Sequence, residues 1–127
     1  RALLASGGQR QQTESLSSAI EASDLPRLQS EVASVRAAPP LIDYVQALVE
    51  ATRSSPAFQH GLSPRAGLAL LAAARAWAWL AGRDMVLPDD VQAVLPPVAR
   101  HRLRSAQGGG HASAEDIATL LRSVAIP

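Results

Sequence analysis

The sequence contains 127 residues, of which 47% are hydrophobic but only four are aromatic, and twelve arginines against eleven acids give a net charge of +1. This length suits one domain with an aliphatic core, and the near-neutral charge provides no broad electrostatic field for nucleic acid or a membrane surface. Because cysteine and lysine are absent, disulfides, thiolate metal sites and a lysine-containing phosphate loop are excluded.

Residues 1–12 indicate the end of a preceding element that runs into a linker, and residues 13–127 indicate one domain. The start carries no cleavable signal pattern. Since the only methionine, Met85, lies in mid-chain, we expect the sequence to be the C-terminal piece of a longer protein. Arginines interrupt its longest apolar run, so no membrane span is expected.

The first half predicts two amphipathic helices after a short apolar stripe at residues 16–20. Ser23 is expected to be the N-cap of the first helix, and Pro26 lies within its first turn, where the missing N–H costs little. Pro39-Pro40 starts the second helix, and residues 54–56 end it. The apolar positions with helical spacing are Leu25, Leu28, Val32 and Val35 in the first helix, and Leu41, Ile42, Val45, Leu48 and Val49 in the second.

The central segment predicts a long helix that opens at the Ser63-Pro64 pair, a good N-cap followed by proline at the first helical position. From residue 66 to residue 81 the segment is apolar almost all round, which is typical of a central helix covered on most sides. Trp77 and Trp79 point to nearly opposite sides of it. One is therefore expected in the core, and the other could cover a subunit or domain surface.

The C-terminal part predicts two further helices. Gly82 ends the central helix, and Pro88-Asp-Asp opens the next one with acids at its positive end. Pro96-Pro97 is expected to kink or split that helix. A capping-box signature, Ser113-x-x-Asp116, opens the last helix. The sum is an all-α small helical bundle of five to six helices, with a minimal strand contact near the C-terminus among residues 85–87, 102–103 and 125–126.

Arg65 is the main candidate for a binding residue. It lies in the first turn of the central helix, where the helix dipole disfavours a cation and favours an anion. Free backbone N–H groups and a guanidinium that point the same way make a phosphate site. The alternative is an exposed arginine that pairs with a nearby acid.

Four motifs follow one another with natural spacing: Tyr44-Val-Gln-Ala-Leu-Val-Glu-Ala-Thr-Arg53, Gly61-Leu-Ser-Pro-Arg65, Gly82-Arg-x-x-Val-x-Pro-x-Asp-Val91 and Arg100-His-Arg-Leu103. Together they resemble the small helical lid of AAA+ ATPases of the MoxR family, and the resemblance covers residues 16–127. Leu87 departs from that family, where a threonine cap is common, and so does Pro96-Pro97.

This resemblance implies an AAA+ lid over residues 13–127, preceded in residues 1–12 by the end of an upstream core that binds ATP and Mg²⁺. Arg65 would be the sensor 2 residue, which contacts the γ-phosphate. The chain alone has neither a Walker A nor a Walker B motif, so we expect no catalysis and no cofactor held by it alone. The parent would be a cytoplasmic ATP hydrolase. Members of the family form rings, usually hexamers, and act as chaperone-like remodellers, often with von Willebrand factor A domain proteins.

Other arginines have competing interpretations. Arg53 could face the nucleotide of a neighbouring subunit, or it could join Arg83 and Asp84 in salt bridges at helix ends. Arg100 and Arg102 belong to the only basic cluster of the sequence. We expect a structural or inter-subunit role for them, because contact with nucleic acid would need a stripe of cations on one face. The three histidines have no metal-ligand spacing, so no metal site is expected.

Two alternatives from other functional classes stay open. The first is a free-standing helical DNA-binding module, because the stretch from Gly82 to Val91 also resembles the loop-to-helix turn of histone-like folds. The near-zero net charge argues against it. The second is a pure protein-interaction domain, which predicts that Arg65 is paired internally. The lid of a chelatase-type AAA+ subunit would look much the same as a MoxR lid.

Overall fold

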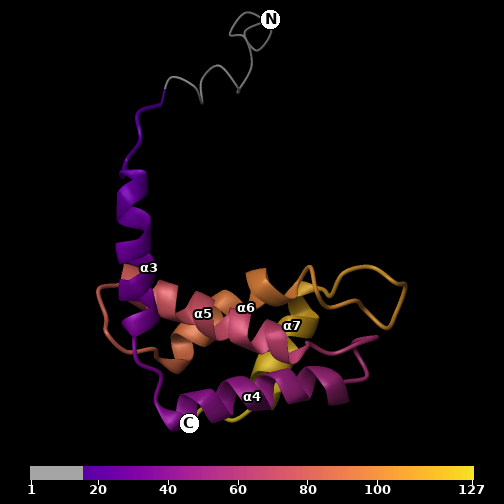
Figure 1. Cartoon of the computed structure of the whole chain (residues 1–127). Coiled ribbons are helices and arrows are strands. Elements are labelled where there is room, and N and C mark those ends of the chain that lie inside the picture. The colour runs from indigo at the N-terminus through magenta and orange to yellow at the C-terminus, as the bar shows by residue number, and fades with distance from the viewer. Residues whose placement is uncertain (1–15) are drawn as a thin grey trace, which may run out of the picture.

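The computed structural model describes residues 16–127, and this part of the chain is an all-α bundle, as predicted (Figure 1). The 1–12 linker and the domain boundary after it lie outside the described residues. A short 3-10 turn precedes five α-helices, and no extended sheet accompanies them between residues 16 and 127. The elements are η1 (Ala22–Asp24), α3 (Leu25–Ser34), α4 (Pro39–Ser54), α5 (Pro64–Leu80), α6 (Pro88–Ala99) and α7 (Ala114–Ser123).

Helix α5 is the centre of the bundle, which explains its apolar composition. It packs against α3, α4 and α6, and α7 closes the far side by packing on α4 and α6. The core between them is aliphatic, and its fully buried large side chains include Leu48, Leu70, Leu95, Leu103 and Ile117. The expected division of the tryptophans is confirmed, since Trp79 packs against the core and Trp77 is 50% exposed.

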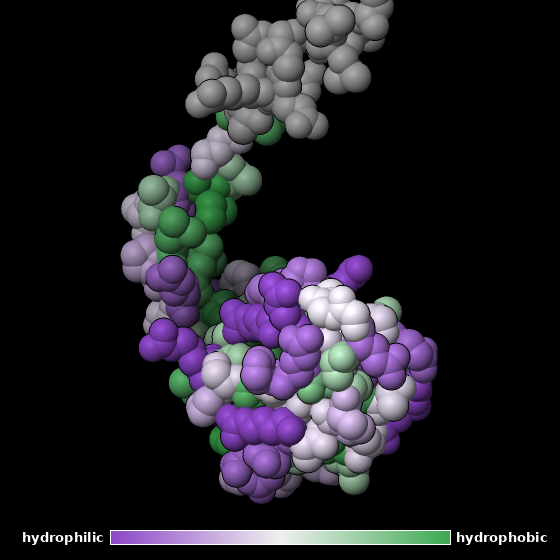
Figure 2. Space-filling view, turned by 90° about the vertical axis from the view of Figure 1, so that its right-hand side faces the viewer, coloured by the Kyte–Doolittle hydropathy of each residue, from purple (hydrophilic) through white to green (hydrophobic). Residues whose placement is uncertain are grey.

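Helix α3 stands apart from the rest of the bundle and contacts it through α5 (Figure 1). Its apolar side is incompletely covered, and Figure 2 shows hydrophobic residues gathered along it. Leu28 and Val32 line a groove that α3 shares with α5, and Leu25, at the start of the helix, is 47% exposed. This helix therefore offers an apolar surface that the described residues do not fill.

One expectation near the start of the domain was wrong. Ser23 does not cap α3. It lies inside the 3-10 turn, whose start is closed instead by the carboxylate of Asp24, which accepts from the backbone N–H of Glu21 at 3.3 Å. The apolar stripe at residues 16–20 forms no helix, and Leu16 is exposed. A stripe of three apolar residues is too short to gain from burial what ordering a helical turn costs.

The adjacent prolines of α6 do not split the helix. It continues through Pro96 and Pro97 to Ala99, because the φ angle fixed by the proline ring is compatible with a helix. What the prolines remove is two N–H donors, and this loss falls in the last turn. The helix ends there, where the N–H of Arg100 still reaches the carbonyl of Pro96 at 3.0 Å.

Isolated β-bridges tie the loops together. Arg36 pairs in parallel with Met85, Phe58 pairs with Ser105, and Arg104 pairs with His111. Of the residues expected to form a strand contact, only Met85 forms a bridge, and its partner is Arg36; residues 102–103 form none. Residues 125–126, which were also predicted to take part, form none of these bridges. Within residues 16–127 no helix is long and apolar enough to span a membrane, and no cluster of possible metal ligands occurs.

Candidate functional site

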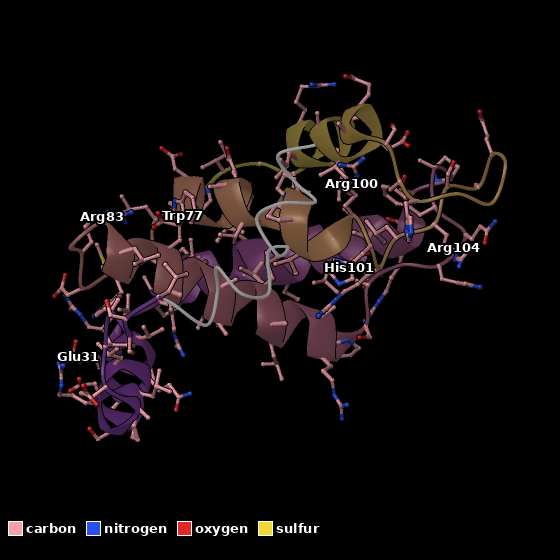
Figure 3. The ribbon with its side chains drawn as sticks, turned by 90° about the horizontal axis from the view of Figure 1, so that it is seen from above. Glu31, Trp77, Arg83, Arg100, His101 and Arg104 are labelled. Carbon is pink, nitrogen blue, oxygen red and sulfur yellow. The ribbon has the colours of Figure 1, made fainter. Side chains whose placement is uncertain are left out.

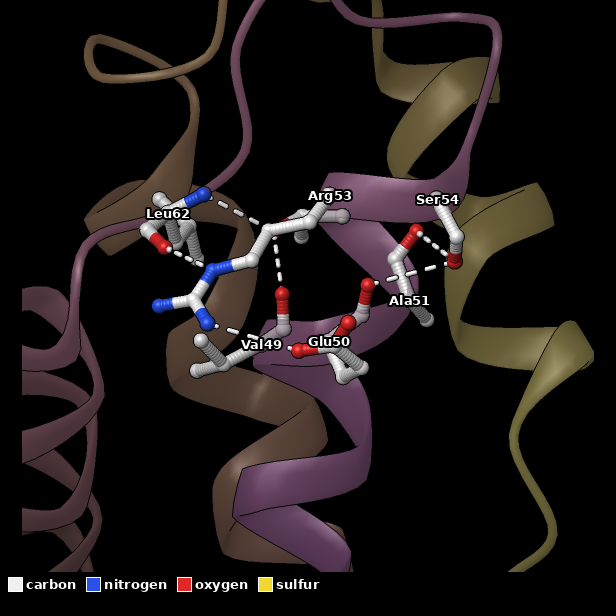
Figure 4. Close-up of polar contacts among 7 residues, drawn as sticks. Val49, Glu50, Ala51, Arg53, Ser54 and Leu62 are labelled. Carbon is white, nitrogen blue, oxygen red and sulfur yellow. Dashed lines mark hydrogen bonds and ion pairs between the residues drawn. The ribbon is translucent and has the colours of Figure 1, made fainter.

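The site is built where the loop after α4 reaches the start of α5. The hydroxyl of Thr52, which is buried, accepts from the backbone N–H of Leu62 at 2.8 Å and donates to the carbonyl of Val49 at 2.6 Å. The Nε of Arg53 donates to the carbonyl of Leu62 at 3.1 Å (Figure 4). Both polar groups of the Leu62 backbone are thus held by the last turn of α4, which fixes the loop just before α5.

Gly61 lies directly against the same turn of α4. A Cβ atom at this position would lie 2.4 Å from Cγ of Arg53 and 2.6 Å from its Cα. Those distances are far below van der Waals contact, and one of the two atoms belongs to the backbone and cannot rotate away. The glycine of the Gly61-Leu-Ser-Pro-Arg65 motif is therefore required for close approach of the loop to the helix.

Ser63 caps α5 as predicted, and its hydroxyl accepts from the backbone N–H of Ala66 at 3.2 Å. Pro64 occupies the first helical position. Arg65 follows in the first turn with its side chain exposed, and it forms no ion pair with any residue between 16 and 127. The internal pairing that the interaction-domain alternative predicted is not found in this part of the chain.

Arg65 lines a cleft of about 560 Å³ together with Arg102. The other lining residues are small or apolar, and none of them carries a carboxylate; they are Gly61, Leu62, Ser63, Ala66 and Ala69. The cleft therefore brings two arginines to the positive end of α5, an arrangement suited to an anion with several oxygen acceptors.

The basic cluster of residues 100–104 does not form one cationic face. Arg102 lines the cleft, and its Nε lies 3.3 Å from Nε2 of His101. Arg104 turns to the glycine-rich loop and donates from Nη1 to the carbonyl of Gly109 at 3.0 Å. Seen from above, Arg104 lies apart from Arg100 and His101 (Figure 3). This divergence argues against the continuous cationic stripe that binding to duplex DNA would use.

Arg53 is engaged within the chain, since it also donates from Nη1 to Glu50 at 3.3 Å. A contact of Arg53 with a neighbouring subunit stays a prediction, as it does for Arg100 and Arg102. Thr52 was missed by sequence reasoning. Its burial could have been predicted, because Thr52 continues the apolar i, i+3, i+4 stripe of Val45, Leu48 and Val49.

The opposite end of α5 is closed by an ion pair between a half-buried arginine and a buried carboxylate. Gly82, with φ of 72°, ends the helix in the left-handed conformation as expected. Arg83 donates a hydrogen bond from each of its two Nη atoms to the carboxylate of Asp90, the one from Nη1 at 2.7 Å, and Asp90 is only 2% exposed. The same carboxylate accepts from the backbone N–H of Leu87 at 2.7 Å and so replaces the missing side-chain cap of α6.

These contacts set the protonation of the pair. The hydrogen bond from Arg83 lowers the pKa of Asp90 below its ordinary value; burial opposes this, and the Leu87 N–H assists it. The hydrogen bond with Asp90 in turn raises the pKa of Arg83. The predicted salt bridges at helix ends are thus present, and Asp84 pairs with Arg36 at 3.1 Å on the surface.

Comparisons with known proteins match this architecture. Residues 50–121 fit the family model of the AAA lid domain. The chain is 42% identical over 90 residues to the uncharacterised protein YeaC of Bacillus subtilis, with 71% of the chain and 28% of that protein covered. It is also 42% identical over 93 residues to the chaperone MoxR1 of Mycobacterium tuberculosis, with 66% of the chain and 25% of that protein covered.

A solved crystal structure has the same fold as this chain. The crystal structure of a candidate ATPase from Cytophaga hutchinsonii superposes with a TM-score of 0.75 at 30% identity, and the match covers 83% of this chain and 36% of that one. The chain thus spans between a quarter and two fifths of the length of these relatives. With the matched family model and the MoxR relatives taken together, the chain belongs to the AAA lid domain family, as the lid of a MoxR-type AAA+ ATPase.

Proposed function

We propose that this lid closes the nucleotide site of its parent ATPase and that Arg65 contacts the terminal phosphate of ATP, the sensor 2 role. One observation carries the proposal: Arg65 is exposed in the first turn of a firmly capped helix and has no acidic partner within residues 16–127. A cation at this helix end is disfavoured until an anion joins it. Binding of a phosphate would relieve that unfavourable charge.

The residues around the cleft fit a phosphate better than a metal ion. Its lining provides two arginines and no carboxylate, whereas Mg²⁺ takes oxygen ligands. We therefore assign to this chain only the cationic contribution to the site. In this proposal the rest of the parent supplies the hydrolytic chemistry. It would provide the phosphate loop, the Mg²⁺ ligands and the attacking water.

The parent is proposed to be an ATP-hydrolysing ring with a chaperone-like remodelling activity. This follows the name of the MoxR1 relative, a chaperone. The family resemblance implies six subunits in this ring. Contacts to the upstream core, to neighbouring subunits and to a von Willebrand factor A domain partner, together with a cytoplasmic location, stay predictions.

The test uses the full-length protein that carries this lid. Arg65→Gln removes the charge and keeps much of the side-chain volume, and ATP hydrolysis is measured at saturating Mg²⁺ and ATP. We expect kcat to fall at least tenfold, because one charge-assisted contact to the transferred phosphate is lost.

The matched control is Arg122→Gln, which removes an equal charge from an exposed arginine on α7 that pairs with Glu115. Its hydrolysis rate should stay within a factor of two of the unmodified protein. A folded Arg65→Gln protein with normal kcat and normal affinity for ATP would contradict the proposed role.

A further inference from the structure

Two arginines from distant parts of the sequence meet at one cleft. Arg65 comes from the first turn of α5, and Arg102 comes from the turn that follows α6. Neither pairs with an acid within residues 16–127, although Arg27, Arg36, Arg53, Arg83 and Arg122 all do. The lining of this cleft contains no acid.

The position of Arg102 is fixed by its neighbours. Its backbone N–H donates to the carbonyl of Ala99 at 2.9 Å, and the N–H of Leu103 reaches the same carbonyl at 2.8 Å. Leu103 and Ala99 are fully buried in the core. The backbone that carries Arg102 is therefore anchored on both sides, so its side chain starts from a fixed place at the edge of the cleft.

The charge balance of the cleft indicates what it accepts. Two like charges that share one concave surface repel each other, and the N-terminal end of α5 adds a further positive potential. An anion bound between the two arginines offsets their repulsion and interacts favourably with the positive end of α5. A phosphate group matches this best, because guanidinium groups donate two parallel hydrogen bonds to its oxygens.

We propose that Arg102 is a second phosphate-binding residue and acts with Arg65 on the terminal phosphate of a nucleoside triphosphate. The inference rests on the proposed function of Arg65 and adds a residue to it. It gives Arg102 a role different from the inter-subunit contact that the sequence alone suggested. The proposal also predicts that the site binds a nucleoside triphosphate more tightly than a diphosphate, because the diphosphate lacks the terminal phosphate that both arginines would hold.

The experiment compares Arg102→Gln, Arg65→Gln and the Arg122→Gln control in the full-length protein. Affinities for ATP and for ADP are measured by calorimetry with Mg²⁺ present, together with the oligomeric state by light scattering. We expect Arg102→Gln to weaken ATP binding about tenfold while ADP binding changes less than twofold. Arg102→Lys should recover part of the loss, because it restores the charge without the bidentate geometry.

The outcomes separate the two proposals. If Arg65→Gln impairs ATP binding or hydrolysis but Arg102→Gln leaves the ratio of ATP to ADP affinity unchanged, this inference is overturned and the role of Arg65 stands. If neither variant changes nucleotide binding or hydrolysis, both proposals fail. If Arg102→Gln disrupts only the oligomer, the arginine is an inter-subunit contact and the inference is overturned. Should Arg102→Gln fail to fold, Arg102→Lys decides the question by the same ratio of affinities.

Discussion

The two ends of helix α5 are held in contrasting ways. At its C-terminal end, Arg83 is paired with Asp90, a carboxylate that is buried and also accepts from the backbone N–H of Leu87. At its N-terminal end, the loop is held by hydrogen bonds from Arg53 and to Thr52 and by close packing at Gly61, and Arg65 is left without an acid. One arginine therefore completes the fold, and the other is available to a ligand.

This difference separates structural charge from functional charge in a small domain. A buried carboxylate stays charged only if partners replace its lost hydration, as Arg83 and Leu87 do for Asp90. The N-terminal loop is instead held through Thr52 and Gly61, with no acid in the cleft lining.

The largest expected effect on stability comes from a side chain placed at Gly61, where the loop before α5 lies directly against α4. Gly61→Ala places a Cβ 2.4 Å from Cγ of Arg53 and 2.7 Å from its backbone nitrogen, so the loop must move away from α4. We expect the free energy of unfolding to fall by about 3 kcal/mol, the upper end of the range for overpacking. Urea denaturation followed by circular dichroism at 222 nm (the helix signal) measures it.

Gly110→Ala is the matched control, because a Cβ at that glycine meets no atom within 4 Å and its φ is not in the left-handed region. Its stability should stay within about 0.5 kcal/mol of the unmodified chain. Equal stability of the two glycine variants would mean that the loop does not rest on α4 as described.

The next largest effect is expected when the ion pair at the C-terminal end of α5 is broken. Asp90→Asn removes the charge that accepts from Arg83 and Leu87, and we expect a loss of about 2 kcal/mol, as for hydrogen bonds to a charged group. Asp84→Asn is the control. It breaks only the exposed pair with Arg36, so its cost should be below about 1 kcal/mol.

The pH dependence follows from the lowered pKa of Asp90, whose main cause is the hydrogen bond from Arg83. Because the folded pKa lies below the unfolded one, the stabilisation is fully present above the ordinary value of 3.8 and is lost as pH falls through the folded pKa. The stability difference between the unmodified chain and Asp90→Asn should therefore shrink in that acidic window. Asp116, whose pKa is lowered by Ser113, is present in both proteins and cancels in the comparison. A difference that is constant down to the lowest accessible pH would show that the Asp90 charge is not what stabilises α6.

Local sequence signals predicted most of the fold. The Ser63-Pro64 start, the Gly82 stop and the Ser113–Asp116 box all work through neighbours within a few residues, so they can be recognised along the chain. Ser23 was assigned wrongly for the same reason: a 3-10 turn closed by Asp24 competes with a serine cap, and both patterns fit the same letters.

The site was predictable only in part. Arg65 could be selected because its helix position alone makes it unusual. Its neighbour in the cleft, Arg102, and the partner of Arg83 are set by how α5 packs on the turn after α6 and on α6 itself. Both Arg83 and Asp90 stand in the motif from Gly82 to Val91, but the motif does not say that they pair, because such contacts depend on tertiary packing.

The smallest expected effect on stability is that of Arg65→Gln. It tests the comparison most sharply, because the same substitution, arginine to glutamine, can be made at both ends of α5. Arg83→Gln should clearly destabilise the chain, since it leaves the buried carboxylate of Asp90 without its main partner. Arg65→Gln should change the free energy of unfolding by less than about 0.5 kcal/mol, with a slight gain favoured because a cation leaves the positive end of a helix. Thermal and urea unfolding of the two variants side by side measure this difference. If Arg65→Gln destabilised the chain as much as Arg83→Gln, Arg65 would be part of the framework, and its availability to a phosphate would have no basis.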